Sequence, residues 1–157
     1  MKQYITMLPM ESGGYRFVEK MNHKFGVLAQ ILSDDFRSGK LIEWFSDEKK
    51  TVEGNDWVEI RKERSAIALY DISDQLNEEY PTIMVELDPA KRFEMSRKNF
   101  AEIIYQWEEL RVSRPNIILV VIHEDNHVSL ETDPTIIKKY QDAGYAFDIN
   151  KGNISSN

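Results

Sequence analysis

Hydrophobic side chains recur at three- and four-residue steps in two long parts of the chain, which is the spacing of an amphipathic helix. The first stripe starts after Lys24 and predicts a helix that ends near Gly39, because glycine commonly ends helices. The second predicts a helix over residues 97–112, with Ser96 as its N-cap and with Trp107 on the apolar face that packs in the core. Both helices are therefore expected to cover a sheet.

A shorter apolar stripe follows Asp133 and Pro134 and predicts a final helix with proline in its first turn. Alternating or β-branched runs predict the strands, over residues 3–8, 15–18, 57–61, 66–72, 82–87, 93–95, 116–122 and 128–131. Residues 116–122 are apolar on both faces, as is typical of a central strand covered from two sides. Residues 41–45 are apolar enough for either a helix or a strand, and the pattern leaves that choice open.

The order of these elements predicts an α+β domain, with a mostly antiparallel sheet packed by two main helices. The chain has 157 residues, no long linker and no internal repeat, so we expect a single domain over residues 1–149. Residues 150–157 are polar and are expected to form a disordered tail.

Composition removes several classes of protein. The chain has no cysteine, which excludes disulfides, thiolate zinc sites and cysteine nucleophiles. The longest apolar run, residues 117–122, is far shorter than the roughly 20 residues of a membrane-spanning helix. The amino-terminal residues contain no signal-peptide segment, and we expect a cytoplasmic protein that does not bind a membrane.

Negative charge is concentrated in the middle of the sequence. The net charge is −7, and residues 43–88 carry thirteen acidic and five basic side chains, a net charge of −8. Such a chain is expected to repel nucleic acid, whose binding proteins cluster lysine and arginine. Acidic side chains between aromatic ones suit the binding of a basic protein, although an acidic segment also serves solubility alone. The candidate binding residues are Glu43, Asp47, Glu48, Glu53, Asp56, Trp57, Glu59, Glu78 and Glu79. Trp44 and Tyr80 are further aromatic candidates, if they are exposed.

Residues 123–127, His-Glu-Asp-Asn-His, match the H-E-x-x-H pattern of zinc peptidases. That chemistry requires a helix, which places both imidazoles and the glutamate on one side. Here the preceding residues favour a strand, and Asp125-Asn126 favours a turn, so we expect a hairpin loop. No metal site is assigned, and the purified protein is expected to lack stoichiometric zinc.

No other pattern indicates catalysis or a cofactor. The sequence has no glycine-rich phosphate loop and no G-x-S-x-G nucleophile, and its paired acidic residues are adjacent and point in different directions. Basic residues around the start of the 97–112 helix suit an anion, but pairing with neighbours such as Glu94 and Asp88 explains them equally. We expect no enzyme and no bound cofactor.

Residues 80–132 resemble bacterial immunity proteins of polymorphic toxin systems, above all those of contact-dependent growth inhibition. The similarity lies in Arg92-Phe93-Glu94-Met95-Ser96-Arg97-Lys98-Asn99-Phe100, Ile104, Trp107-Glu108-Glu109-Leu110, Pro115 and the strand at 117–122. The resemblance implies a small protein that binds a cognate toxin domain, often a nuclease, and has no catalytic residues. Contact residues in such families vary with the toxin, so none is transferred.

The sequence therefore favours an immunity protein that neutralises a basic toxin domain through its acidic surface. Two alternatives stay open at this point. One is a zinc-dependent hydrolase that uses residues 123–127, and the other is a small regulatory module that forms oligomers.

Overall fold

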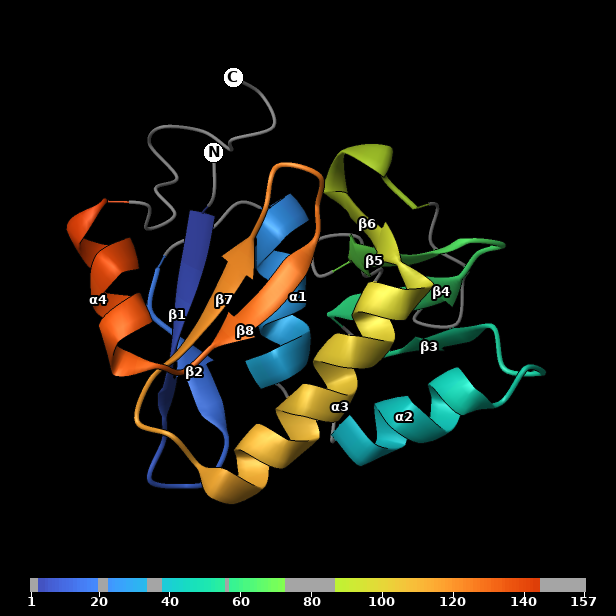
Figure 1. Cartoon of the computed structure of the whole chain (residues 1–157). Coiled ribbons are helices and arrows are strands. Elements are labelled where there is room, and N and C mark those ends of the chain that lie inside the picture. Colours follow the sequence, from blue (N-terminus) through green and yellow to red (C-terminus); the bar gives the residue numbers. More distant parts are fainter. Residues whose placement is uncertain (1–2, 20–22, 34–37, 56, 73–86, 145–157) are drawn as a thin grey trace, which may run out of the picture.

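The computed structural model describes residues 3–19, 23–33, 38–55, 57–72 and 87–144 (Figure 1). Within these ranges the helices are α1 (His23–Ser33), α2 (Ser38–Ser46), η1 (Pro89–Lys91, a 3-10 helix), α3 (Arg97–Ser113) and α4 (Pro134–Asp142). The strands are β1 (Gln3–Pro9), β2 (Tyr15–Phe17), β3 (Val52–Gly54), β4 (Val58–Lys62), β5 (Ala66–Asp71), β6 (Arg92–Ser96), β7 (Ile118–Ile122) and β8 (Val128–Glu131).

The α+β class predicted from the sequence is confirmed, and the strands are divided between two four-stranded sheets. Sheet A has the order β2-β1-β7-β8 and sheet B the order β3-β4-β5-β6. Every neighbouring pair in both sheets is antiparallel. Each sheet therefore has two edge strands, and β3 is one of them.

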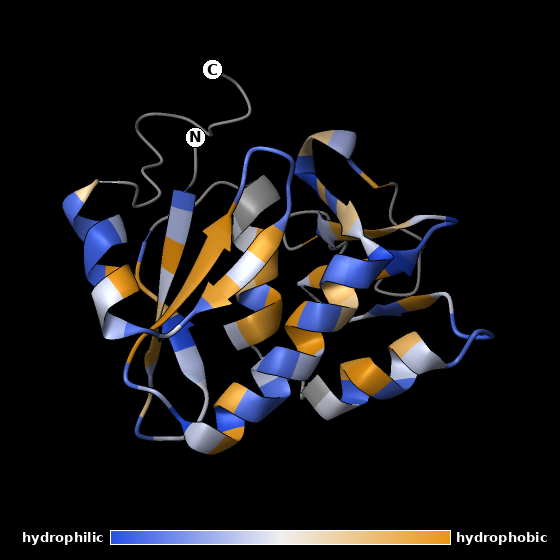
Figure 2. Cartoon of the chain, in the orientation of Figure 1, coloured by the Kyte–Doolittle hydropathy of each residue, from blue (hydrophilic) through white to orange (hydrophobic). Residues whose placement is uncertain are grey.

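Strand β7 is hydrophobic throughout (orange in Figure 2) and is buried along its whole length, as expected for a central strand covered on both faces. Val120 belongs to the main core between the sheets, whereas Leu119 and Val121 face the opposite way, toward Ile137 of α4. Helix α4 thus covers one face of sheet A. Asp133 caps this helix, since its Oδ1 accepts from the backbone N–H groups of residues 135 and 136.

One hydrophobic core joins the two sheets. It contains Ile5 and Val120 of sheet A together with Ile60 and Leu69 of sheet B, all without measurable exposure. Helix α1 contacts strands of both sheets, and α3 contacts β5 and β6 on one side and β8 on the other. Helix α2 packs against α3, so it reaches the core through that helix.

Helix α3 begins where the sequence predicts. Ser96 Oγ accepts from the backbone N–H of Asn99 at 3.0 Å, which makes Ser96 the N-cap. Asn99 is itself buried, and its amide pairs with both backbone groups of Val128, at 2.8 Å from Nδ2 to the carbonyl and 2.7 Å from the N–H to Oδ1. The Asn99 amide therefore supplies the two hydrogen bonds that a residue of a neighbouring strand would otherwise make with Val128 at the edge of β8.

The prediction of one helix from Lys24 to Gly39 is wrong in its end point. Helix α1 ends at Ser33, and α2 starts at Ser38, so Gly39 lies in the first turn of a new helix. The reason is that Leu41 and Trp44, three residues apart, are buried on one face of a second helix. Residues 41–45, which the sequence left open, are therefore helical. Strand β3 was not predicted from the sequence.

Some predictions fall outside the described residues. The strand over 82–87 does so except for Leu87, and the expected tail at 150–157 does so completely. Asp88 follows as the cap of η1, with its Oδ1 accepting from the backbone N–H of Ala90 at 2.9 Å.

Candidate partner-binding surface

The acidic residues predicted as a binding surface lie in two places. Glu43 and Glu48 are exposed on α2 and in the loop that follows it, beside the half-buried Asp47. Trp57 and Glu59 lie on sheet B. Asp56, Glu78 and Glu79 lie outside the described residues.

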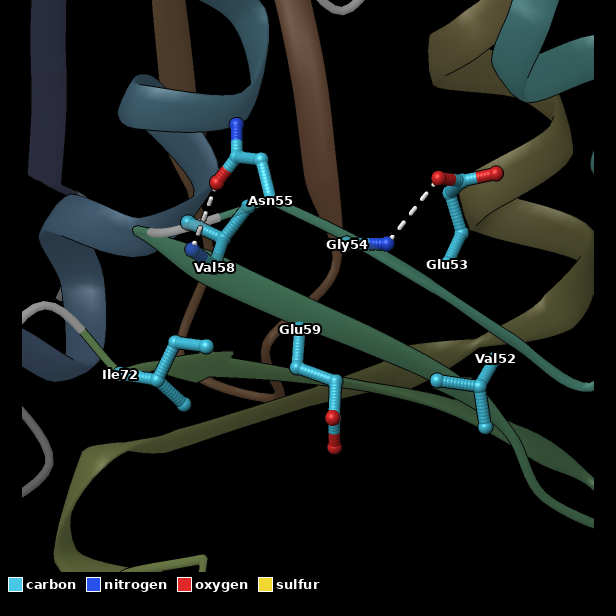
Figure 3. Close-up of a pocket in the computed structure, with 7 residues that line it drawn as sticks. All are labelled: Val52, Glu53, Gly54, Asn55, Val58, Glu59 and Ile72. Atoms are coloured by element: carbon cyan, nitrogen blue, oxygen red, sulfur yellow. Dashed lines mark hydrogen bonds between the residues drawn. The ribbon is translucent and has the colours of Figure 1, made fainter. Parts of the chain in front are cut away.

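The register of β3 separates two of the candidates. Glu53 is opposite Ile60, which is fully buried, so its side chain lies on the core side of sheet B at the edge of the sheet. There its Oε1 lies 3.7 Å from Lys40 Nζ of α2. Glu59 points to the other side of the sheet (Figure 3). The structure therefore does not bring Glu53 and Glu59 onto one face.

The outer face of sheet B is formed at β4 by alternate residues. Val58 and Ile60 are buried in the core, so Glu59 and Arg61, which alternate with them along β4, project outward. Trp57 is 53% exposed. Among the three tryptophans it is the exposed one, because Trp44 and Trp107 are each only 2% exposed.

A turn that is fixed by hydrogen bonds holds Trp57. Asn55 Oδ1 accepts from the backbone N–H groups of Trp57 and Val58, at 2.7 and 3.0 Å. The carbonyl of Trp57 accepts from the backbone N–H of Ile72 at 2.9 Å, which continues the pairing of β4 with β5. Trp57 is thus presented on ordered backbone, with Ile72 beside it.

An open depression of about 270 Å³ lies where β3 turns into β4 (Figure 3). Its lining residues are Val52, Glu53, Gly54, Asn55, Val58, Glu59 and Ile72. Gly54 is required here, since a Cβ at this position would lie 2.7 Å from the carbonyl oxygen of Val58. On this part of the sheet, Val52 and Glu59 point to the same side in Figure 3.

The remaining charges of this face pair with one another. Arg92 donates to both carboxylate oxygens of Glu63, at 2.6 and 2.8 Å, to Glu94 at 2.9 Å and to the Tyr70 hydroxyl at 2.8 Å. The hydrogen bonds from Arg92 hold the pKa of Glu63 below its usual value, and the same carboxylate raises the pKa of Arg92. Arg97 donates to the carbonyl of Glu63. Arg92 and Arg97, two of the basic residues around the start of α3, therefore form hydrogen bonds within the protein.

Trp44, considered as an exposed anchor, is instead a core residue. Its ring lies edge-on to Phe100 of α3 at 6.4 Å between centroids. Its burial follows from α2 being a helix that packs on α3. Tyr80 lies outside the described residues.

Residues 123–127 form the hairpin loop predicted from the sequence. The backbone N–H of His123 donates to the carbonyl of His127 at 2.9 Å, and Asn126 adopts a positive φ of 63°. The two imidazole rings lie 5.5 Å apart between centroids, and His123 Nε2 lies 3.0 Å from Ser129 Oγ. The H-E-x-x-H chemistry needs a helix, whereas these residues form a loop between two strands. In the described ranges no group of three or more metal-ligating side chains comes together.

The helices of the described part of the chain are too short or too polar to cross a bilayer. Comparisons with protein-family models, with curated proteins and with solved structures found no match.

Proposed function

We propose that the chain is an immunity-type inhibitor, which acts in the bacterial cytoplasm and neutralises a toxin domain by binding its basic face. The observation that carries this proposal is Trp57, a half-exposed tryptophan whose backbone is held by hydrogen bonds to Asn55 and Ile72. Tryptophan is the residue type most enriched among those that dominate binding energy in protein interfaces. A nuclease, which presents a basic face to nucleic acid, is the partner class that suits this surface.

The charge of the molecule supports the same partner. A net charge of −7, with the excess in residues 43–88, attracts a basic domain and accelerates its approach at low ionic strength. Glu43 and Glu48 of the α2 region are exposed and contribute to this attraction without contacting the depression. The α2 region therefore steers a partner, and Trp57 anchors it.

The proposal is tested by co-expression with the neighbouring gene and recovery through a tag on this chain. We expect one stoichiometric basic domain to remain bound after a moderate-salt wash, and its activity to be lost in the complex. Recovery of this chain alone, as a monomer or as an oligomer of itself, would contradict the proposal.

Two matched variants assign the binding to Trp57. Trp57→Ala is expected to weaken the complex by at least tenfold, as is typical of a dominant interface residue. Tyr105→Ala is the control, because Tyr105 of α3 is an aromatic residue with almost the same exposure, 51%. Equal affinities of the two variants would show that Trp57 is not the anchor.

A further inference from the structure

Glu59 already holds a guanidinium group of its own chain. Arg61 Nε donates to Glu59 Oε2 at 2.7 Å, and both side chains project from β4 on the outer face. The Arg61 side chain is 38% exposed and the Glu59 side chain 23%. The Glu59 carboxylate thus already accepts a hydrogen bond from a guanidinium group, and it retains some exposure to solvent.

This internal pair is easily replaced. The contact uses Nε and one carboxylate oxygen, whereas an arginine arriving from outside can pair with both oxygens through its two terminal nitrogens. Partly exposed ion pairs contribute little to stability, so separating Glu59 from Arg61 costs little.

Trp57 makes the same position selective for arginine. Trp57 lies two residues before Glu59, which is about 7 Å along extended backbone, and the hydrogen bond from Ile72 to its carbonyl extends the pairing of β4 with β5 to this residue. A guanidinium bound at Glu59 is then within reach of the indole face, where arginine stacks better than lysine. Val52 and Ile72 supply apolar contact for the methylene groups of such a side chain.

We infer that the outer face of sheet B binds an arginine of the partner between Glu59 and Trp57, and that Arg61 competes with it for Glu59. This inference rests on the proposed function, because it names the group through which the basic partner is held. Arg61 therefore limits affinity: it occupies the carboxylate in the unbound protein and repels the incoming positive charge.

The experiment uses N-acetyl-arginine amide as the probe and follows the fluorescence of Trp57, the exposed tryptophan. The wild-type chain is expected to bind this probe more tightly than N-acetyl-lysine amide, and to bind the uncharged N-acetyl-citrulline amide at least tenfold more weakly. Equal binding of the arginine and citrulline probes would overturn the inference.

Four variants separate the site from general charge. Glu59→Gln is expected to weaken arginine binding severalfold, whereas Glu109→Gln, which removes the same charge at an exposed position on α3, leaves it unchanged. Arg61→Gln is expected to strengthen it severalfold, whereas Arg64→Gln, in the exposed turn after β4, does not. The inference fails if Arg61→Gln and Arg64→Gln have the same effect. Circular dichroism of each variant shows that the fold is retained.

The probe experiment and the co-expression experiment fail independently. A captured toxin domain that depends on Trp57 but not on Glu59 would preserve the proposed function and contradict the arginine site. Selective arginine binding without any captured partner would preserve the site and contradict the inhibitor function.

Discussion

Lys62 places its ammonium group where three backbone carbonyls converge at the end of α2. Nζ donates to the carbonyls of Trp44, Asp47 and Lys50, at 2.6, 2.8 and 2.7 Å, and lies 4.5 Å from the centre of the Trp44 ring. Desolvation lowers the pKa of Lys62, and the nearby carboxylates of Glu48 and Asp47 oppose that shift. The side chain thus adds a charged donor to carbonyl groups at and just beyond the carboxyl end of α2, where the helix dipole favours a positive charge.

Replacing Lys62 tests how much this contact stabilises α2. Lys62→Met keeps the apolar stem and removes three charge-assisted hydrogen bonds, so we expect a loss of about 2 kcal/mol in the free energy of unfolding. Urea denaturation followed by circular dichroism measures the loss. Lys49→Met, at an exposed position in the same loop, is the control and is expected to change stability by less than about 0.5 kcal/mol. A similar loss in both variants would show that Lys62 acts only through net charge.

Glu63 makes stability depend on pH in the acidic range. Its pKa is lowered in the folded protein by the hydrogen bonds from Arg92, so the folded state binds the proton less tightly than the unfolded state. The pair therefore stabilises the protein above the unfolded pKa of about 4.3 and stops doing so as the pH falls through the lower folded pKa.

Glu63→Gln is expected to destabilise the protein by about 0.5 to 1 kcal/mol at pH 7, a modest value because the Glu63 side chain is 39% exposed. The difference from wild type should shrink below about pH 4, where the wild-type carboxyl gains its proton. Unfolding midpoints in urea from pH 3 to pH 7 measure this. Glu109→Gln, at an exposed position on α3, controls for the loss of one carboxylate. A difference that stays constant over this range would contradict the role of ionised Glu63.

Sequence alone predicted part of the candidate site at the scale of residues. The predicted strand over residues 57–61 put Val58 and Ile60 on one side, and the structure buries both, which leaves Glu59 on the outer face. The face of Glu53 could not be predicted, because it depends on the register of β3 against β4, a pairing of separate segments. The pair of Glu59 with Arg61 was missed, although their spacing of two residues in a strand is a signal that would have found it.

At the scale of elements, Asn99 joins α3 to the edge of β8. Asn99→Leu leaves the N–H and the carbonyl of Val128 buried without these partners, so we expect a loss of about 2–4 kcal/mol in the free energy of unfolding. Gln106→Leu is the matched control, because Gln106 also reaches β8 from α3, but through one long contact of 3.4 Å to the carbonyl of Leu130. Thermal or urea unfolding of the two variants compares them. Comparable losses of stability in the two variants would show that the two hydrogen bonds of Asn99 stabilise the protein no more than the single long contact of Gln106.

Elements whose signal is local were predictable, and those that depend on distant partners were not. Helix α3 combines a capping serine with a long apolar stripe, and β7 is apolar on both faces, so both were identified. Strand β3 has three residues and one hydrophobic side chain, and only its pairing with β4 makes it a strand. Gly39 was interpreted as a helix stop because the sequence did not show that α2 begins there.

At the scale of the whole molecule, the shared core predicts that both sheets unfold together. Val120→Ala in sheet A and Ile60→Ala in sheet B are each expected to lower the free energy of unfolding, by about 1–4 kcal/mol, while leaving one transition. Circular dichroism and tryptophan fluorescence should report the same midpoint for each variant. Two separate transitions, each shifted by only one of the variants, would show that the sheets are independent domains.

The pairing of β1 with β7 determines when sheet A can form during synthesis of the chain. Gln3 lies opposite Ile122, whereas all of sheet B lies between residues 52 and 96. At 5–20 residues per second, a ribosome needs roughly 5–20 s to proceed from β1 to β7. During that interval β1 has only the local hairpin with β2, and Ile5 and Met7, both fully buried in the finished protein, have no β7 to pack beside. Strand β1 is thus translated long before its partner β7, and sheet A is completed only after every strand of sheet B has been synthesised.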